Sequence, residues 1–403
     1  MRSLYRSLTA GLLCAGLAAL IAAPGELAAQ AKKDDKKDAK KDPKVDPKAK
    51  EKEMDDTRDA TLSFGTSDGL ALRGYWFPAV GTNGNKRADA VMMFPAPGNK
   101  VHDSWIGLAK SLSEKGFAVL LFDWRGCGMN SASERGIRVF EDTERFLLDQ
   151  MNMQYQKSSV NRGLTYSTFP ARYRDFLFND LMAARFFLDK QNDAGKCNTN
   201  RIWVVSEREG AQMGLAFIAT EFQRNSVYQA KVNVLDIGGQ FKSAGKDYAG
   251  LVGLSYSATN GTASAIYRAA LPTIGTPRLV KDAMVHLENR LAMVMVHGKK
   301  EVGSAGAGSS KSAITGAGAG GSEADMKTRF KYMKEIDNSK QAKAVSGIDL
   351  IGTDDPFGAK EYIIKAMVDI SKDKQDFGKE PTDREASKIT TVPRFSLEAY
   401  KPR

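Results

Sequence analysis

The stretch best placed to do chemistry is a predicted bend between a strand and a helix. Ile202–Val205 is a short apolar run of β-branched and aromatic side chains, which predicts a buried strand. From Gly210 onward, apolar and small residues indicate a buried helix. The apex residue is Arg208, which is cationic and not a nucleophile, and Ser206 is expected to point under the strand's end.

Arg208 at this bend could serve one of two purposes. At the start of the predicted helix, free backbone amides and the helix dipole favour a carboxylate or phosphate ligand. Alternatively, Arg208 pairs with a nearby acid and fills the site. The candidate acids are Glu207, Glu209, Asp123 and Glu301. Pairing is the favoured interpretation, because charges near a bend commonly pair, and both purposes stay open.

The elements that would hold this bend alternate between strands and helices. Two opening strands, Thr61–Phe64 and Leu70–Phe77, flank a glycine-containing turn. Later strands are expected at 89–94, 117–122, 202–205, 230–237, 291–296 and 345–351. Helices are expected at 103–115, 172–189, from 210 onward, and at 323–336 and 359–370. The alternation predicts an α/β fold with a doubly wound, mostly parallel sheet, whose ligands bind at the carboxyl ends of the strands.

The folded domain is expected to span residues 59–380. Residues 129–171 are irregular and residues 240–280 are rich in Gly, Ser and Ala, and both ranges are interpreted as inserted cap segments. Residues 303–322 are of low complexity and predict a flexible loop, since they lack the Lys-Ser/Thr ending of a phosphate-binding loop. Residues 381–403 are expected to form a C-terminal tail.

Three segments, in the expected order and spacing, resemble the α/β-hydrolase superfamily. Phe94–Trp105, which begins Phe-Pro-Ala-Pro-Gly, is similar to the loop that holds the oxyanion site. Asp123–Ser131, Asp-Trp-Arg-Gly-Cys-Gly-Met-Asn-Ser, is similar to the family's Asp-x-Arg-Gly-x-Gly-x-Ser pattern and is the most specific of the three. Arg201–Ala211 is similar to the nucleophile elbow. The resemblance implies a hydrolase-like sheet with a catalytic serine, acid and base at its carboxyl edge.

The sequence departs from this family at the nucleophile and at the oxyanion loop. Arg208 stands in the nucleophile position. The family's His-Gly-x-Gly would fall on Pro95–Gly98, which places Pro97 near a donor position. Proline has no N–H to offer an oxyanion.

The base also departs from the family pattern. It should follow the strand expected at Val345–Ile351, but no histidine lies beyond His297. Asp354 or Asp355 stands near the position of the imidazole. The acid position, after the preceding strand, is held by Glu301, so an acid is expected to survive without its partner.

One other serine could serve as a nucleophile. Ser255 follows Gly253 closely, although no apolar strand is expected to lead into it, and His297 could approach from the next strand. Of the remaining histidines, His102 is interpreted as a loop or helix-cap residue and His286 as a helix-surface residue.

Two functions therefore stay open. The first is a non-catalytic α/β-hydrolase-like protein that binds a small anion or a protein partner, or has a structural role. Its candidate binding residues are Arg208, Glu207, Glu209, Gly98, Asp123 and His297. The second is an active ester or peptide hydrolase with a non-standard catalytic constellation. No cofactor is expected, and no histidine or cysteine spacing predicts a metal site.

The N-terminus has the order of a secretory signal peptide. Arg2 and Arg6 precede an uncharged stretch rich in Leu and Ala, Ser7–Gly25, and Ala28–Ala31 offers small residues for cleavage. Residues 1–31 are therefore expected to be removed on export to the periplasm or medium, leaving no transmembrane span. An uncleaved membrane anchor is the alternative.

The remaining composition limits the partners. Residues 32–58 alternate Lys with Asp and Glu, which predicts a disordered, solvated tether. The formal net charge is +11. It is spread along the chain without a basic block, so no nucleic-acid partner is expected. Cys127 and Cys197 could pair in an exported protein, but two unpaired thiols fit at least as well.

Overall fold

The computed structural model describes most of the expected domain. The described residues are 61–81, 87–131, 152–154, 164–232, 244–256, 291–299, 332–337, 345–352, 354–372 and 392. The chain separates into two units, 1–50 and 51–403, and every described residue lies in the second. The predicted signal peptide, tether and 303–322 loop lie outside the described residues, as does the tail except Val392. Within the described ranges, no helix has the length and apolar character needed to cross a bilayer.

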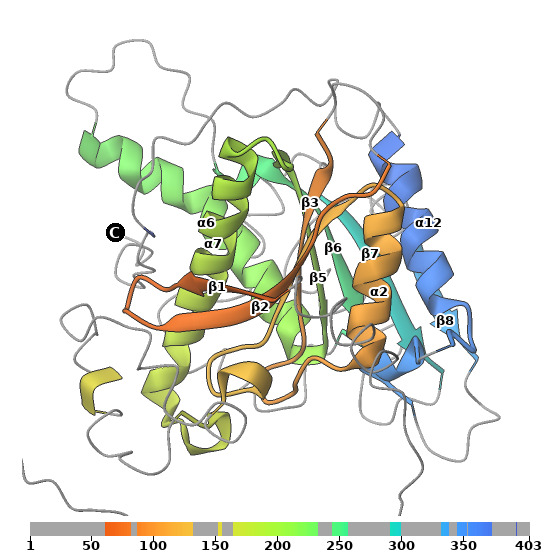
Figure 1. Ribbon diagram of the computed structural model, residues 1–403, viewed down its shortest axis with the longest axis horizontal. Helices are drawn as coiled ribbons and strands as arrows, with labels where there is room; N and C mark the ends of the chain where they lie inside the picture. The colour runs from red at the N-terminus through yellow and green to blue at the C-terminus, as the bar shows by residue number, and fades with distance from the viewer. Residues whose placement is uncertain are drawn as a thin grey trace, which may run out of the picture. The chain divides into compact units, whose positions relative to one another are not determined.

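A single eight-stranded sheet organises the domain, in the order β1-β2-β4-β3-β5-β6-β7-β8 (Figure 1). The strands are β1 (Thr61–Gly65), β2 (Ala71–Phe77), β3 (Asp89–Phe94), β4 (Ala118–Phe122), β5 (Asn198–Glu207), β6 (Tyr248–Leu254), β7 (Ala292–Gly298) and β8 (Tyr332–Ile336). β2 pairs antiparallel with β1 and β4, and all other pairs are parallel. The predicted α/β fold, with a mostly parallel sheet and antiparallel opening strands, is confirmed.

Helices cover both faces of this sheet. α2 (Asp103–Glu114) and α12 (Ala359–Lys372) contact each other on one face, and α6 (Leu177–Asp193) and α7 (Arg208–Val232) cover the other (Figure 1). Each face has its own buried apolar cluster. The central strands are therefore apolar on both sides, as buried parallel strands require. Short 3₁₀ turns are η1 (Gly128–Asn130), η3 (Tyr166–Thr168), η4 (Ala171–Phe176), η5 (Ala244–Asp247) and η6 (Gly347–Leu350).

The strand beside β5 differs from the sequence-based expectation. Residues 230–232 belong to α7, and the neighbouring strand is β6, Tyr248–Leu254, inside the range assigned to a 240–280 insertion. Two glycines in β6 gave it the composition of a loop. In the structure, a Cβ at Gly250 would collide with the Trp203 ring, and one at Gly253 would approach the Met295 sulfur. Glycine is therefore needed here for packing rather than for a turn.

Two further assignments near the C-terminus were wrong. Tyr332–Ile336, predicted as the end of a charged helix, forms β8 at the edge of the sheet, where Lys334 and Glu335 are exposed. Charged side chains are common on edge strands because they discourage further pairing. Val345–Ile351, predicted as a strand, contains η6, and its apolar side chains pack into the cluster of α2 and α12. A short buried apolar run does not by itself distinguish strand from helical turn.

Candidate functional site

The bend between β5 and α7 has the strained geometry that its position implies. Arg208, the first residue of α7, has φ 45°, a left-handed value that non-glycine residues rarely adopt. A Cβ on Gly210 would overlap the Ser206 side chain and lie 2.8 Å from the Pro95 carbonyl oxygen. Glycine is required there because the loop after β3 approaches the helix backbone closely. The expected strand, bend and helix are thus present, with Arg208 at the apex.

The Ser206 hydroxyl is held away from the apex. It is fully buried and donates a hydrogen bond to the Phe94 carbonyl oxygen at 2.7 Å. Ser206 therefore ties the end of β5 to β3 beneath the bend, as its place before the bend predicted.

The side chain of Arg208 is half-buried and contacts a segment far along the chain. Its Nη2 donates to the Ser346 hydroxyl at 2.5 Å and to the Ser346 carbonyl oxygen at 3.3 Å. Among the described residues, Arg208 makes no ion pair, so the expected pairing with Glu207, Glu209 or Asp123 is not what holds it. Glu301 lies outside the described residues. We refer below to residues 345–352 as the 345–352 segment.

Glu207 joins the bend to two other segments. Its carboxylate is 2% exposed. Oε1 accepts from the Ala96 backbone N–H at 3.3 Å and from Asn99 Nδ2 at 2.9 Å, and Oε2 accepts from the Ile348 N–H at 2.8 Å. Glu207 therefore connects the end of β5 with residues 95–101, which we call the oxyanion loop, and with the 345–352 segment.

Asp123 and Cys127 accept hydrogen bonds from backbone N–H groups of the same loop. The Asp123 carboxylate is buried and accepts from the backbone N–H groups of Val101 at 2.7 Å and Met129 at 3.0 Å. Gly98 has φ 95°, and its N–H donates to Cys127 Sγ at 3.4 Å. Asp123 thus orders two loops by backbone contacts and is not a partner of Arg208.

Part of the domain matches a family model. The α/β-hydrolase fold model matches residues 90–192, which contain β3, the oxyanion loop, β4 and the Asp123–Ser131 segment. The match ends before β5, so the bend lies outside the matched residues. Together with the observed strand order, the match shows that the domain has an α/β-hydrolase-like fold. No curated protein matches the chain.

Solved structures resemble this domain at low sequence identity. The esterase domain of a Rhodothermus marinus protein is 12% identical with a TM-score of 0.41, covering 77% of this chain and 97% of its own. Est1E from Butyrivibrio proteoclasticus is 10% identical with a TM-score of 0.42, covering 77% and 98%. The α/β hydrolase GrgF from Penicillium sp. sh18 is 17% identical with a TM-score of 0.38, covering 79% and 98%.

The segment that contacts the Arg208 side chain is not, as the sequence had suggested, the one that contains Asp354 and Asp355. Asp355, suggested near the imidazole position, instead caps α12 by accepting from the N–H groups of Lys360 at 2.9 Å and Glu361 at 3.0 Å. Asp354 is exposed. The residue that contacts the apex side chain is Ser346, just before η6. Sequence reasoning missed Ser346 because no motif marks it.

The ends of β6 and β7 bring together the alternative serine and histidine. The buried strand β6 does lead into Ser255, contrary to the sequence-based expectation, and Ser255 has φ 52°. Its hydroxyl accepts from the Gly347 N–H at 2.5 Å, and its own N–H donates to the Val296 carbonyl oxygen. His297 on β7 is 2% exposed, and neither ring nitrogen has a hydrogen-bond partner among the described residues. The two residues are neighbours along the strand ends without the hydrogen bond that a nucleophile–base pair uses.

The two cysteines of the domain are free and buried. Of the two arrangements left open by the sequence, the unpaired one is observed. Burial raises the pKa of Cys127 to about 12, although the Gly98 N–H lowers it in part. A thiol with that pKa is protonated at neutral pH and is a poor nucleophile.

Tyr166 covers the oxyanion loop from the end of the predicted 129–171 insertion. A Cβ on Gly98 would lie 3.1 Å from the Tyr166 ring, and the Tyr166 N–H donates to the Gly126 carbonyl oxygen at 3.0 Å. The Arg174 guanidinium lies 5.6 Å from the centre of the Tyr166 ring. At least this end of the insertion therefore packs against the site.

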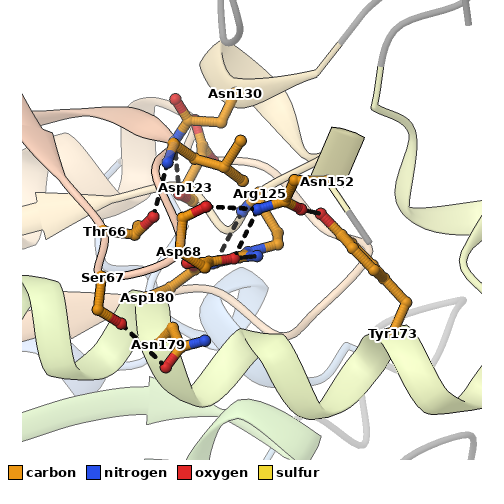
Figure 2. A network of polar contacts seen from close by, with 11 residues as sticks. Thr66, Ser67, Asp68, Asp123, Arg125, Asn130, Asn152, Tyr173, Asn179 and Asp180 are labelled. Atoms are coloured by element: carbon orange, nitrogen blue, oxygen red, sulfur yellow. Dashed lines mark hydrogen bonds and ion pairs between the residues drawn. The ribbon is translucent and has the colours of Figure 1, made fainter. Parts of the chain in front are cut away.

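A buried ionic network supports the loop that carries Cys127 (Figure 2). Arg125 donates to both carboxylates of a pair, Asp68 from the β1–β2 turn and Asp180 from α6, and all three side chains are inaccessible. Asn152 donates to Asp68 at 2.8 Å and accepts from the Tyr173 hydroxyl at 2.5 Å. The network joins four segments that are distant in sequence.

The two carboxylates of this network have opposite pKa shifts. Burial alone would raise the pKa of Asp68, but the Arg125 guanidinium and several hydrogen bonds lower it overall. Burial raises the pKa of Asp180 to about 6 despite the same guanidinium. One guanidinium cannot fully compensate two buried carboxylates, so one of them takes up a proton more readily.

Metal binding finds no support in the described part of the chain, where no group of three or more His, Cys, Asp or Glu side chains is placed to hold an ion. Glu207 and Asp123 are engaged by backbone and amide donors, and Glu209 is half-buried beside Arg208.

Proposed function

We propose that this protein is a non-catalytic α/β-hydrolase, exported from the cell, with a binding or structural role. The observation that carries the proposal is Arg208 at the strained apex, with its guanidinium bound to Ser346. The position that would present a nucleophile presents a cation that bridges two segments of the chain.

Two further features support a lost active site. Acyl transfer needs a nucleophile, a base beside it and N–H donors for the oxyanion. The Ala96 N–H is engaged by the Glu207 carboxylate, and Pro97 has no N–H. The residue that contacts the Arg208 side chain is Ser346, which is not a base.

A small anion is a second candidate, favoured by the charge of Arg208. The guanidinium is half-buried at the start of α7 and has no carboxylate partner among the described residues. A carboxylate or phosphate would neutralise the charge of the guanidinium, and the helix N-terminus would also favour such an anion. The structural role remains the preferred one, because Ser346 already accepts from the guanidinium.

An activity assay tests the main proposal. Folded protein should not hydrolyse a short-chain aryl ester and should not react with a fluorophosphonate probe. Turnover or labelling would contradict the proposal and favour the alternative, an active ester or peptide hydrolase with a non-standard constellation. In that case Ser255→Ala should abolish the signal, because Ser255 lies at the end of β6 beside His297.

Anion binding is tested by thermal melting. If Arg208 binds a free anion, phosphate or acetate should raise the melting temperature of the parent protein more than chloride at equal ionic strength, and Arg208→Ala should remove the difference. If neither anion stabilises the parent while Arg208→Ala lowers its melting temperature, the structural role is supported.

Export rests on the N-terminal sequence pattern. The mature protein should be found in the periplasmic or extracellular fraction, with an N-terminus close to Lys32. Recovery of full-length chain in the membrane fraction would instead indicate an uncleaved anchor.

A further inference from the structure

The chain binds the Glu207 carboxylate in the way that a protein binds a carboxylate ligand. Both carboxylate oxygens are used, and the three donors are the Ala96 N–H, Asn99 Nδ2 and the Ile348 N–H, at 3.3, 2.9 and 2.8 Å. All three donors are neutral groups, and they come from two segments separated by more than two hundred residues in sequence. We call these three donors the carboxylate site. Several N–H donors converging on one carboxylate form strong, charge-assisted hydrogen bonds.

The backbone of the 345–352 segment is shaped around this carboxylate. Gly347 has φ 66°, and a Cβ at that position would overlap Glu207 Oε2 and lie 3.2 Å from Arg208 Nε. The Gly347 N–H is in turn held by the Ser255 hydroxyl at 2.5 Å. The missing side chain leaves room for the carboxylate, so the site is a cradle as well as a set of donors.

The oxyanion loop contributes to the site with a group that acyl transfer would need free. In a hydrolase, backbone N–H groups of this loop meet the negative charge that develops on the substrate. Here the Ala96 N–H already meets a negative charge that belongs to the chain. Because Glu207 is 2% exposed, water does not compete for these donors.

We propose that the oxyanion loop and the 345–352 segment form a carboxylate-binding site which Glu207 fills as an internal ligand. A free monocarboxylate takes the same site when the Glu207 side chain is shortened. This inference rests on the proposed non-catalytic function in one respect, that no reaction requires the Ala96 N–H to be free. It adds the ligand class of the site and assigns to Glu207 the role of holding the two segments together.

The size of the missing group makes the test specific. Glu207→Ala removes a CH₂ and a carboxylate, which acetate matches, and Glu207→Gly removes one carbon more, which propionate matches. We expect both variants to melt below the parent. Acetate should raise the melting temperature of the Ala variant most, and propionate that of the Gly variant. We expect each rise to be about 2 °C or more relative to chloride at equal ionic strength. The parent should not respond, because its site is full.

Glu207→Gln is the matched control, since its amide fills the same volume and should block rescue by either acid. Equal stabilisation of the parent, the Gln variant and the Ala variant by acetate would overturn the proposal. An Ala variant with the same melting temperature as the parent would also overturn it. If Glu207→Ala is recovered only unfolded, the yield of refolding in acetate is compared with the yield in chloride instead of the melting temperatures. Equal yields in the two salts would then overturn the proposal. Ester hydrolysis by the parent would contradict the non-catalytic function without altering these melts.

Discussion

Arg208, at the apex of the bend between β5 and α7, donates two hydrogen bonds to Ser346, which lies 138 residues further along the chain. A strained φ at such a bend is the geometry that α/β-hydrolases use to present a nucleophile. In this chain the same geometry directs the Arg208 guanidinium onto the 345–352 segment. The bend therefore joins two segments that are distant in sequence.

Replacing Arg208 by alanine should lower the free energy of unfolding by about 1.5–3 kcal/mol, the usual cost of losing hydrogen bonds to a charged donor. Urea denaturation of the variant measures it. Glu209→Gln is the control, because Glu209 is equally half-buried but makes no hydrogen bond to a described side chain, and a change within about 0.5 kcal/mol is expected.

A double-mutant cycle with Ser346→Ala isolates the contact itself. The coupling energy should be about 1 kcal/mol, since the Ser346 hydroxyl accepts at 2.5 Å while the carbonyl acceptor survives the substitution. If the two substitutions lower the free energy of unfolding additively, Arg208 stabilises the bend through contacts other than the Ser346 hydroxyl.

The buried network around Arg125 makes a larger prediction. Arg125→Leu leaves the carboxylates of Asp68 and Asp180 buried without their cation, which should cost about 3–5 kcal/mol of unfolding free energy. Lys365→Ala is the contrasting variant, because its ion pair with Asp369 is exposed and should contribute no more than about 0.5 kcal/mol. Similar losses in the two variants would contradict a structural role for the network.

The same network predicts how stability depends on pH. Burial raises the pKa of Asp180 from 3.8 to about 6 in the folded protein, so the folded state binds this proton more tightly than the unfolded state. The contribution of Asp180 to the free energy of unfolding should therefore increase as the pH falls from 7 through 6 towards 4, by up to about 3 kcal/mol. Asp68 has the opposite shift, and its contribution is lost only as the pH falls below 3.8.

Comparison of two variants separates Asp180 from other carboxyl groups. Asp180→Asn should remove a clear part of the gain in the free energy of unfolding between pH 7 and pH 5. The pKa of Asp175 is also raised to about 6 by burial, so Asp175→Asn should remove a different and additive part. Denaturation at several pH values measures both, and an unchanged pH profile in Asp180→Asn would refute the assignment.

Much of the fold could be predicted because local patterns and tertiary packing agree. The opening hairpin, β3, β4, β5 and α12 follow from apolar runs and turn residues, and the order of three motifs predicts the family. β6 was missed because Gly250 and Gly253 are dictated by the Trp203 and Met295 side chains on neighbouring strands. Such a requirement has no local signal in the sequence.

The site was predictable only in part for a similar reason. The bend places Arg208, and the absence of a histidine beyond His297 is visible in the sequence. The partners of the site residues come from other segments. Ser346 and Ile348 reach Arg208 and Glu207 through the packing of η6 between α2 and β6, and the sequence there contains only an apolar run. Prediction of which acid or hydroxyl meets Arg208 therefore needed the tertiary structure.

Two glycines at helical positions, Gly210 and Gly107, differ in the space available for a side chain. Gly210 lies in the first turn of α7, where a Cβ would overlap the Ser206 side chain and approach the Pro95 carbonyl oxygen to 2.8 Å. Gly107 lies within α2, where nothing lies within 4 Å of a Cβ. Gly210→Ala should lower the free energy of unfolding by about 1–3 kcal/mol, because the carbonyl cannot move without shifting the oxyanion loop.

Gly107→Ala should instead raise the free energy of unfolding by about 0.5–1 kcal/mol, since alanine restricts the unfolded chain and favours a helix. Opposite signs for the same substitution in two helices would show that the close approach of the oxyanion loop, and not helix propensity, fixes glycine at the bend. If Gly210→Ala were neutral, the loop would have to yield at Pro95. The hydrogen bond between the Ala96 N–H and Glu207 would then be lost as well, and the acetate response of Glu207→Ala should disappear in the double variant.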